Sequence, residues 1–134
     1  MELLLDTHMA LWFMDGSPSI PDRARHEISD ARNTVFVSDV SAWEVAIKHA
    51  KRPDVMPKPA AEFVSRCKAV GFIGLPISLE AILEYEKIDC SDAEAVHRDP
   101  FDRMLIAQAR AANMSLVTHD QKLALYHEPH VAIF

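Results

Sequence analysis

The chain has 134 residues, of which 49% are hydrophobic and 25% are charged, and its 20 acidic side chains outnumber 14 lysines and arginines to give a formal net charge of −6. This length and composition predict one globular domain over residues 1–134 and exclude a disordered, coiled-coil or collagen-like chain. No apolar run approaches the ~20 residues of a membrane span, and we expect neither a signal peptide nor a membrane partner. Cys67 and Cys90 form no disulfide or metal-binding pattern, so we expect a cytoplasmic protein.

Short apolar runs alternate with helical segments along the chain, which predicts an α/β fold with a parallel sheet. In chain order we expect a strand at 3–6, helices at 9–14 and 21–33, a strand at 35–38, helices at 41–51 and 60–70, a strand at 72–77, a helix at 79–87, a loop at 89–98, a helix at 100–113, a strand at 115–118, a helical turn at 123–126 and an edge strand at 131–134. In sheets of this kind, ligands bind at the carboxyl ends of the strands.

Several acidic residues occupy positions that would bring them to this edge of the sheet. Asp6 and Asp120 each follow an apolar strand, and Asp102 lies in the first turn of its helix on the apolar, inward-facing stripe. Glu44 lies close to the apolar stripe of its own helix, and Asp99, three residues before Asp102, is a fifth candidate. We therefore expect these carboxylates to point toward one rim of the molecule.

Each of these acids also has a purely structural explanation. The acids that precede helices could cap them, and Asp102 could interact with the dipole of its helix. Glu44 could pair with Lys48 one turn later or form a capping box with Ser41. Clustering all of them is nevertheless unfavourable, because like charges and desolvation raise the pKa of carboxyl groups. A site that keeps them ionised needs a cation, and Mg²⁺ or Mn²⁺ prefers such oxygen ligands.

A divalent cation would also explain how an acidic protein could act on a polyanion. Proteins that hold nucleic acid by charge alone are usually basic, and this chain is not. A carboxylate-bound Mg²⁺ binds phosphate oxygens and lowers the pKa of bound water, so a metal-dependent phosphodiesterase or nuclease is the leading hypothesis.

Other phosphate-handling and hydrolytic classes lack their defining residues. A haloacid-dehalogenase phosphatase needs a second Asp two residues after Asp6, where this chain has His8. A receiver domain needs a phosphoacceptor Asp after the third strand, and residues 76–78 offer none. The three glycines form neither a P-loop nor a dinucleotide-binding turn, and no G-x-S-x-G elbow is present.

Four segments of the chain carry a resemblance to a known family. Residues 3–8, 41–48, 97–109 and 116–120 read LLLDTH, SAWEVAIK, HRDPFDRMLIAQA and LVTHD. In this order they resemble PIN-domain ribonucleases, and most closely the toxins of VapBC-type toxin–antitoxin pairs. The resemblance implies a three-layer α/β/α sandwich with a central, mainly parallel sheet of about five strands. It further implies Mg²⁺-dependent cleavage of RNA by a metal-activated water, with Mn²⁺ as a substitute.

The family's catalytic and metal-binding acids match Asp6, Glu44, Asp102 and Asp120, of which we expect Asp6 and Asp102 to be the most direct ligands. Asp99 matches an additional acid of this subgroup. A homodimer and an antitoxin that inserts a basic side chain into the site are also implied.

Further residues beside the acids have less defined roles. Thr118 matches a small hydroxyl residue that orients the site. Arg103 could bind RNA phosphate or balance the nearby carboxylates, and His97 could contact phosphate or fill a local polar role. The alternative to an enzyme is a catalytically silent PIN-like module that binds RNA or a protein partner.

Overall fold

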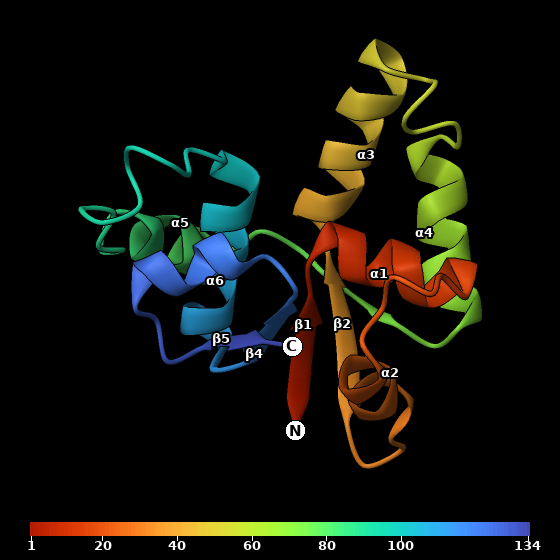
Figure 1. Ribbon diagram of the computed structural model, residues 1–134, viewed down its shortest axis with the longest axis horizontal. Helices are drawn as coiled ribbons and strands as arrows, with labels where there is room; N and C mark the ends of the chain where they lie inside the picture. Colours follow the sequence, from red (N-terminus) through yellow and green to blue (C-terminus); the bar gives the residue numbers. More distant parts are fainter.

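The computed structural model describes residues 1–134 and is built on a five-stranded sheet in which all neighbouring strands are parallel (Figure 1). The strand order is β3-β2-β1-β4-β5. The strands are β1 (Glu2–Leu5), β2 (Thr34–Ser38), β3 (Ile73–Leu75), β4 (Ser115–Thr118) and β5 (Val131–Ile133). This confirms the predicted parallel sheet, including the edge position of the last strand.

Helices cover both faces of the sheet. They are α1 (Thr7–Asp15), α2 (Asp22–Ser29), α3 (Asp39–Lys51), α4 (Ala60–Ala69), α5 (Leu79–Tyr85), α6 (Pro100–Ala112) and the short 3₁₀ helix η1 (Gln121–Tyr126). In Figure 1, α1, α2 and α4 lie on one side of the sheet, and α5 and α6 lie on the other. The three-layer α/β/α sandwich expected from the sequence is therefore observed. None of the helices combines the length and the apolar character needed to cross a bilayer.

Two apolar cores explain why the strands read as continuous hydrophobic runs. Leu3 and Leu5 of β1 point into the core beneath α1, α2 and α4, whereas Leu4 points into the core beneath α6. Alternate residues of a strand face opposite sides of a sheet, so a strand covered on both faces needs apolar side chains throughout. All three leucines are at most 1% exposed. Each such burial contributes roughly 1.5–3 kcal/mol.

Most helix boundaries differ from the sequence prediction by one to four residues, and polar side chains set two of them. Helix α2 ends at Ser29 rather than residue 33, since the Asp30 carboxylate accepts a hydrogen bond of 2.9 Å from the Arg32 backbone N–H and forms a turn. Helix α3 begins at Asp39 because the Ser38 hydroxyl caps it, accepting from the Val40 N–H at 2.9 Å.

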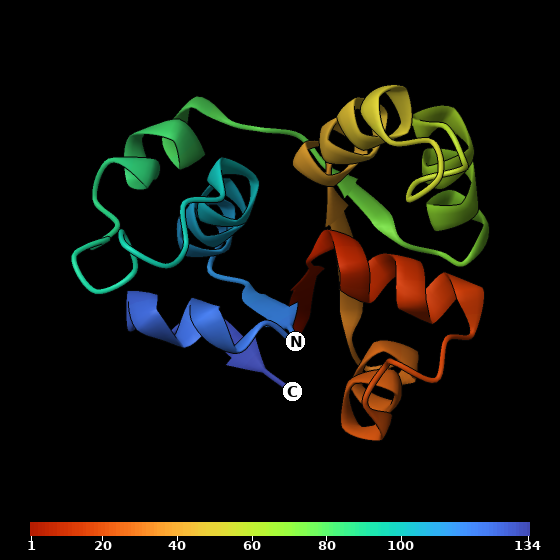
Figure 2. The same cartoon turned by 45° about the horizontal axis from the view of Figure 1, so that its top comes forward.

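The order in which the strands are added to the sheet reverses between β1 and β4, which lie side by side at its centre. A crevice opens at the carboxyl ends of the strands where connections leave in opposite directions. Figure 2 shows α1 leaving the end of β1 on one side of this point, with α6 on the other. The fold thus places residues that follow β1 and β4, together with the start of α6, around one opening.

Candidate functional site

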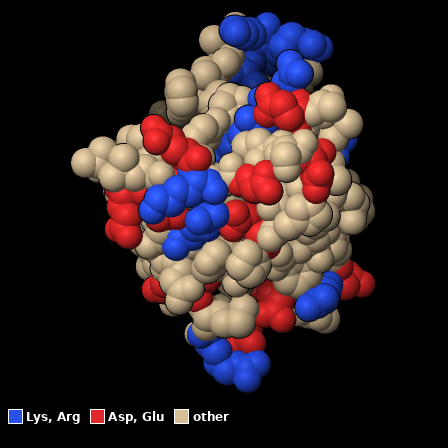
Figure 3. Space-filling model, turned by 90° about the vertical axis from the view of Figure 1, so that its left-hand side faces the viewer, with Lys and Arg blue, Asp and Glu red and all other residues tan.

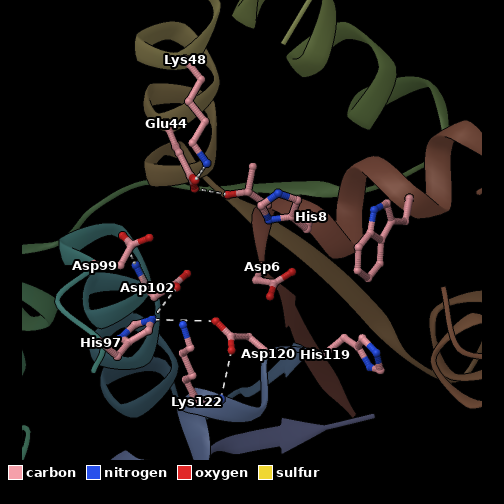
Figure 4. Close-up of a pocket in the computed structure, with 12 residues that line it drawn as sticks. Asp6, His8, Glu44, Lys48, His97, Asp99, Asp102, His119, Asp120 and Lys122 are labelled. Atoms are coloured by element: carbon pink, nitrogen blue, oxygen red, sulfur yellow. Dashed lines mark hydrogen bonds and ion pairs between the residues drawn. The ribbon is translucent and has the colours of Figure 1, made fainter. Parts of the chain in front are cut away.

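A cleft of about 490 Å³ lies at this opening, and only one of its twelve lining residues is hydrophobic. Four separate segments of the chain supply its acidic side chains (Figure 4). The carboxylates that line it are those of Asp6, Glu44, Asp99, Asp102 and Asp120. The structure therefore brings all five acids selected from the sequence to one place.

Asp6 is fixed at the end of β1 by two hydrogen bonds. One carboxylate oxygen, Oδ1, accepts from the Met9 N–H at 2.8 Å and so caps α1. The other, Oδ2, accepts from the Thr118 hydroxyl at 2.6 Å, and Thr118 Oγ1 in turn accepts from the Asp120 N–H at 3.0 Å. Asp6 is thus both a helix cap and a member of the acidic cluster, and the hydroxyl of Thr118 holds its orientation.

Both carboxylate oxygens of Glu44 have partners inside the protein. Thr7 Oγ1 lies 2.7 Å from Oε1, and Lys48 Nζ lies 2.5 Å from Oε2. The expected pairing with Lys48 is therefore present, whereas the capping box with Ser41 is absent because α3 begins two residues earlier. Glu44 is only 4% exposed, and it brings the ammonium group of Lys48 to the cleft.

Asp99 and Asp102 stand at the start of α6. Asp99 caps this helix, with its Oδ1 accepting from the N–H groups of Phe101 at 2.8 Å and Asp102 at 3.3 Å. Pro100, the first residue of the helix, needs no partner for its nitrogen. The Asp102 side chain faces the cleft, where its Oδ2 lies 3.0 Å from His97 Nε2.

Asp120 completes the ring of acids from the end of β4. Its Oδ1 caps η1 by accepting from the Lys122 N–H at 3.0 Å, while its Oδ2 lies 3.9 Å from His97 Nε2. The side chain of Lys122 also lines the cleft, and Figure 4 shows it between His97 and Asp120. Each capping role proposed for Asp6, Asp99 and Asp120 is therefore real, and each cap also holds its carboxylate at the cleft.

The cluster carries an electrostatic cost that changes the acidity of two members. Burial, assisted by the charges of the four other acids of the cleft, raises the pKa of Asp102 to about 8. Burial also raises the pKa of Asp6, although the hydrogen bonds from Thr118 and Met9 oppose the change. A bound cation would remove this penalty, because it stabilises the ionised form of every carboxylate around it.

The donor atoms fit a hard divalent cation. One ligand atom each from His97, Asp102 and Asp120 lies within 4.8 Å of the other two. Asp6 lines the same cleft, and carboxylate oxygens are the ligands that Mg²⁺ and Mn²⁺ prefer. Glu44 is less available as a direct ligand, because Thr7 and Lys48 already occupy its oxygens.

Two residues beside the acids take the structural one of the two roles that the sequence left open. Arg103 does not reach freely toward solvent: its side chain is 14% exposed and donates to Glu94 at 2.9 Å, to the carbonyl of His97 at 2.9 Å and to the hydroxyl of Tyr126 at 2.9 Å. His97 is 7% exposed and contacts Asp102 directly. The position of His97, five residues before Asp102, was the only available signal, and the sequence gives no sign that the loop folds back there.

Comparisons with known proteins agree with this architecture. Among solved structures, a chain of VapBC2 from Rickettsia felis, bound to a promoter DNA fragment, is 16% identical with a TM-score of 0.68, and the match covers 100% of this chain and 98% of the other. VapBC-1 from nontypeable Haemophilus influenzae is 13% identical with a TM-score of 0.67, and the match covers 99% of this chain and 98% of the other. VapBC-5 from Mycobacterium tuberculosis is 18% identical with a TM-score of 0.62, and the match covers 99% of this chain and 97% of the other. At these identities the matches show a shared fold.

A search of curated proteins finds no significant match. The family model of the PIN domain matches residues 3–128, which include every acid of the cleft. The chain therefore belongs to the PIN-domain family.

Proposed function

We propose that this protein is a Mg²⁺-dependent endoribonuclease that acts as the toxin of a toxin–antitoxin pair. The observation that carries the proposal is the convergence of five carboxylates from distant segments on one polar cleft, with the pKa of Asp102 raised to about 8. PIN-domain membership supports a nuclease, and the solved neighbours include a member of the VapBC family of toxin–antitoxin systems.

In this proposal the acids of the cleft have different roles. Asp6 and Asp102 would hold the cation most directly, and Asp120 would complete its shell or orient a water bound to it. Glu44 contributes chiefly by holding Lys48, since both of its oxygens are engaged. The cation, Mg²⁺ or Mn²⁺, would when bound neutralise phosphate charge and lower the pKa of a water.

Local positive charge would complement the cation in binding RNA. Lys48 and Lys122 approach the acidic cluster from different elements, α3 and η1 (Figure 4). On the side formed by α5 and α6, Figure 3 shows acidic and basic side chains interspersed. Such a face offers little charge attraction for a polyanion, so we expect RNA binding to concentrate at the cleft and to depend on the cation.

A cognate antitoxin would occupy a second hollow that adjoins the cleft. This hollow has a volume of about 300 Å³, and half of its twelve lining residues are hydrophobic. It shares His8, Trp12 and Lys48 with the acidic cleft. A segment with an apolar face could fill this hollow and extend one basic side chain onto the carboxylates, as the resemblance implies.

We further propose that the protein forms a homodimer through α5. Leu79, Ile82 and Leu83 of this short helix are 71%, 46% and 54% exposed. Adjacent exposed apolar side chains of this kind are typical of protein–protein contacts.

The free cysteines Cys67 and Cys90 are consistent with the cytoplasmic location that we expect.

Incubation of the purified protein with single-stranded RNA tests the proposed activity. We expect cleavage with Mg²⁺, loss of cleavage in excess chelator and recovery on adding Mn²⁺. The Asp102→Asn variant is the matched inactive control. Cleavage that survives excess chelator, or that persists in Asp102→Asn, would contradict the mechanism, whereas RNA binding without cleavage would favour a silent binding module.

A further inference from the structure

His97 lies in the wall of the acidic cleft and belongs to a hydrogen-bonded chain that ends on Asp102. Its Nε2 is 3.0 Å from Asp102 Oδ2, and its Nδ1 is 2.6 Å from the hydroxyl oxygen of Tyr126. Arg103 Nε donates to that same hydroxyl oxygen at 2.9 Å. His97 and Tyr126 are 7% and 1% exposed, so protein atoms rather than bulk water supply these partners.

The identity of these partners favours one of the two ring nitrogens of His97 as the carrier of the hydrogen. A guanidinium group can only donate, so the Tyr126 oxygen accepts from Arg103 and its own hydrogen is free to point elsewhere. His97 Nδ1 is the nearest acceptor at 2.6 Å, because the alternative, the His97 carbonyl, lies at 3.4 Å. With Nδ1 accepting, the hydrogen of a neutral ring resides on Nε2, where it donates to Asp102.

This arrangement leaves the two oxygens of Asp102 with different tasks. His97 occupies Oδ2, and the other oxygen remains available to a ligand in the cleft. A neutral N–H group orients a carboxylate without neutralising it, whereas an ammonium or guanidinium group in the same place would compete with a cation. Ligating carboxylates in metal sites are commonly held in this way by outer hydrogen-bond donors.

His97 Nε2 lies close enough to Asp102 and Asp120 to share a cation with them. We propose that His97 is instead a positioning residue that holds Asp102 for cation binding through an Nε2–H donor and is not itself a ligand. This inference rests on the proposed metal-dependent function. Tyr126 and Arg103 fix the ring: Arg103 also donates to the His97 carbonyl at 2.9 Å, so the backbone and the side chain of His97 are held by the same neighbour. Arg103 thereby has an orienting role two steps removed from the cleft.

The first experiment reads the tautomer directly in the metal-free protein, at a pH above 8 so that the Asp102 carboxylate is ionised. Nitrogen-15 NMR of the histidine rings distinguishes a protonated ring nitrogen from an unprotonated one. We expect Nε2 protonated in His97 and a loss of this preference in Tyr126→Phe, which retains the aromatic ring but lacks the hydroxyl. A His97 signal with Nδ1 protonated would overturn the proposal, since Nε2 would then present its lone pair to the cleft.

The second experiment measures Mn²⁺ binding without RNA. We compare His97→Gln, which keeps an N–H donor, with the apolar variant His97→Leu, and we verify by circular dichroism that both are folded. We expect His97→Leu to weaken Mn²⁺ affinity about 10- to 100-fold, in the range found for outer partners of metal ligands, and His97→Gln to stay within a few-fold of the original protein. In the original protein, pulsed electron paramagnetic resonance of bound Mn²⁺ should show no directly coordinated histidine nitrogen.

The outcomes separate this inference from the proposed function. If Asp102→Asn weakens Mn²⁺ binding but His97→Leu does not, the positioning role of His97 is wrong and the metal site stands. A coordinated histidine nitrogen would likewise overturn the positioning role and make His97 a ligand. If the original protein binds no Mn²⁺ at all, the proposed function fails and the role of His97 fails with it.

Discussion

The hydroxyl of Thr118 donates a hydrogen bond of 2.6 Å to the carboxylate of Asp6, although the two residues are 112 positions apart in the chain. This bond joins the carboxyl ends of β4 and β1 at the centre of the sheet, where the acidic cleft opens. The bond also partly offsets the burial that raises the pKa of Asp6. The Thr118 hydroxyl can make this bond because β4 and β1 are neighbours in the sheet, and the bond affects the pKa of Asp6, a proposed metal ligand.

Thr118→Val should weaken both stability and metal binding. Valine keeps the shape of threonine but cannot donate to Asp6 or accept from the Asp120 N–H, and leaving buried polar groups without partners costs roughly 1–3 kcal/mol. Thermal unfolding should therefore show a lower melting temperature, and a Mg²⁺ titration a weaker affinity. Thr118→Ser, which retains the hydroxyl, is the control; equal losses in both variants would mean that the hydrogen bond is unimportant.

Asp6→Asn and Asp102→Asn should each reduce RNA cleavage by more than about 100-fold while leaving the fold intact, because each removes a proposed direct ligand and even the outer partners of metal ligands are worth 10- to 100-fold. In the metal-free protein each should also raise the melting temperature, since the lost charge relieves repulsion within the cluster. Glu62→Gln, at a half-exposed acid of α4 outside the cleft, is the matched control and should change neither property. Cleavage within a few-fold of the original protein in Asp102→Asn would show that the site is misassigned.

The stability of the metal-free protein should fall as pH rises. The pKa of Asp102 is about 8 in the folded protein, against an ordinary value of 3.8 for an aspartate in an unfolded chain, so between these values the folded state retains a proton that the unfolded state has lost. The contribution of this group is greatest below about pH 4 and is lost as pH approaches about 8. Denaturant unfolding at several pH values across this range measures how steeply the free energy of unfolding falls with pH.

Two comparisons identify the source of this pH dependence. Asp102→Asn should have a flatter profile, because it cannot titrate at this position. Mg²⁺ should restore stability at the alkaline end, where the carboxylates are ionised and available as ligands. An unchanged slope in Asp102→Asn would assign the effect to other groups.

The sequence predicted the elements well where apolar periodicity was clear. Strand β4 and the helix beginning at Pro100 follow directly from the sequence, because a buried parallel strand is a short apolar run and a proline after Asp99 marks a helix start. Helix α3 is less regular than its sequence suggests: Trp43 is 58% exposed, and its ring packs edge-to-face on Phe101 with the ring centroids 5.2 Å apart. A helix that packs against two cores, with Val40 in one and Val45 in the other, has no single stripe.

The acids of the cleft were predictable, but their hydrogen-bond partners were not. Asp6, Asp102 and Asp120 could be placed at the sheet edge, since strand ends and first helical turns are visible in the pattern. The contact between His97 and Tyr126 joins positions 29 residues apart through a loop and η1, and no local pattern encodes it. Long-range side-chain contacts of this kind depend on how the chain packs, which the periodicity of a single segment does not specify.

The exposed face of α5 should mediate self-association. The double variant Leu79→Asp, Leu83→Asp should be monomeric in light scattering coupled to size exclusion, whereas the original protein should be a dimer. Both side chains are more than half exposed, so these charges should disturb the interface without entering the core. Val70→Asp, at an exposed apolar position at the end of α4, should remain dimeric; a dimer in the double variant would place the interface elsewhere.

The most direct test of the central claim is an anomalous-scattering map from crystals of the protein soaked in Mn²⁺. A manganese peak between the carboxylates of Asp6 and Asp102, absent from crystals of Asp102→Asn treated in the same way, is the predicted result. A fully soaked crystal with no peak in the cleft, or with manganese only at other surfaces, would contradict the claim that these acids converge to hold a divalent cation.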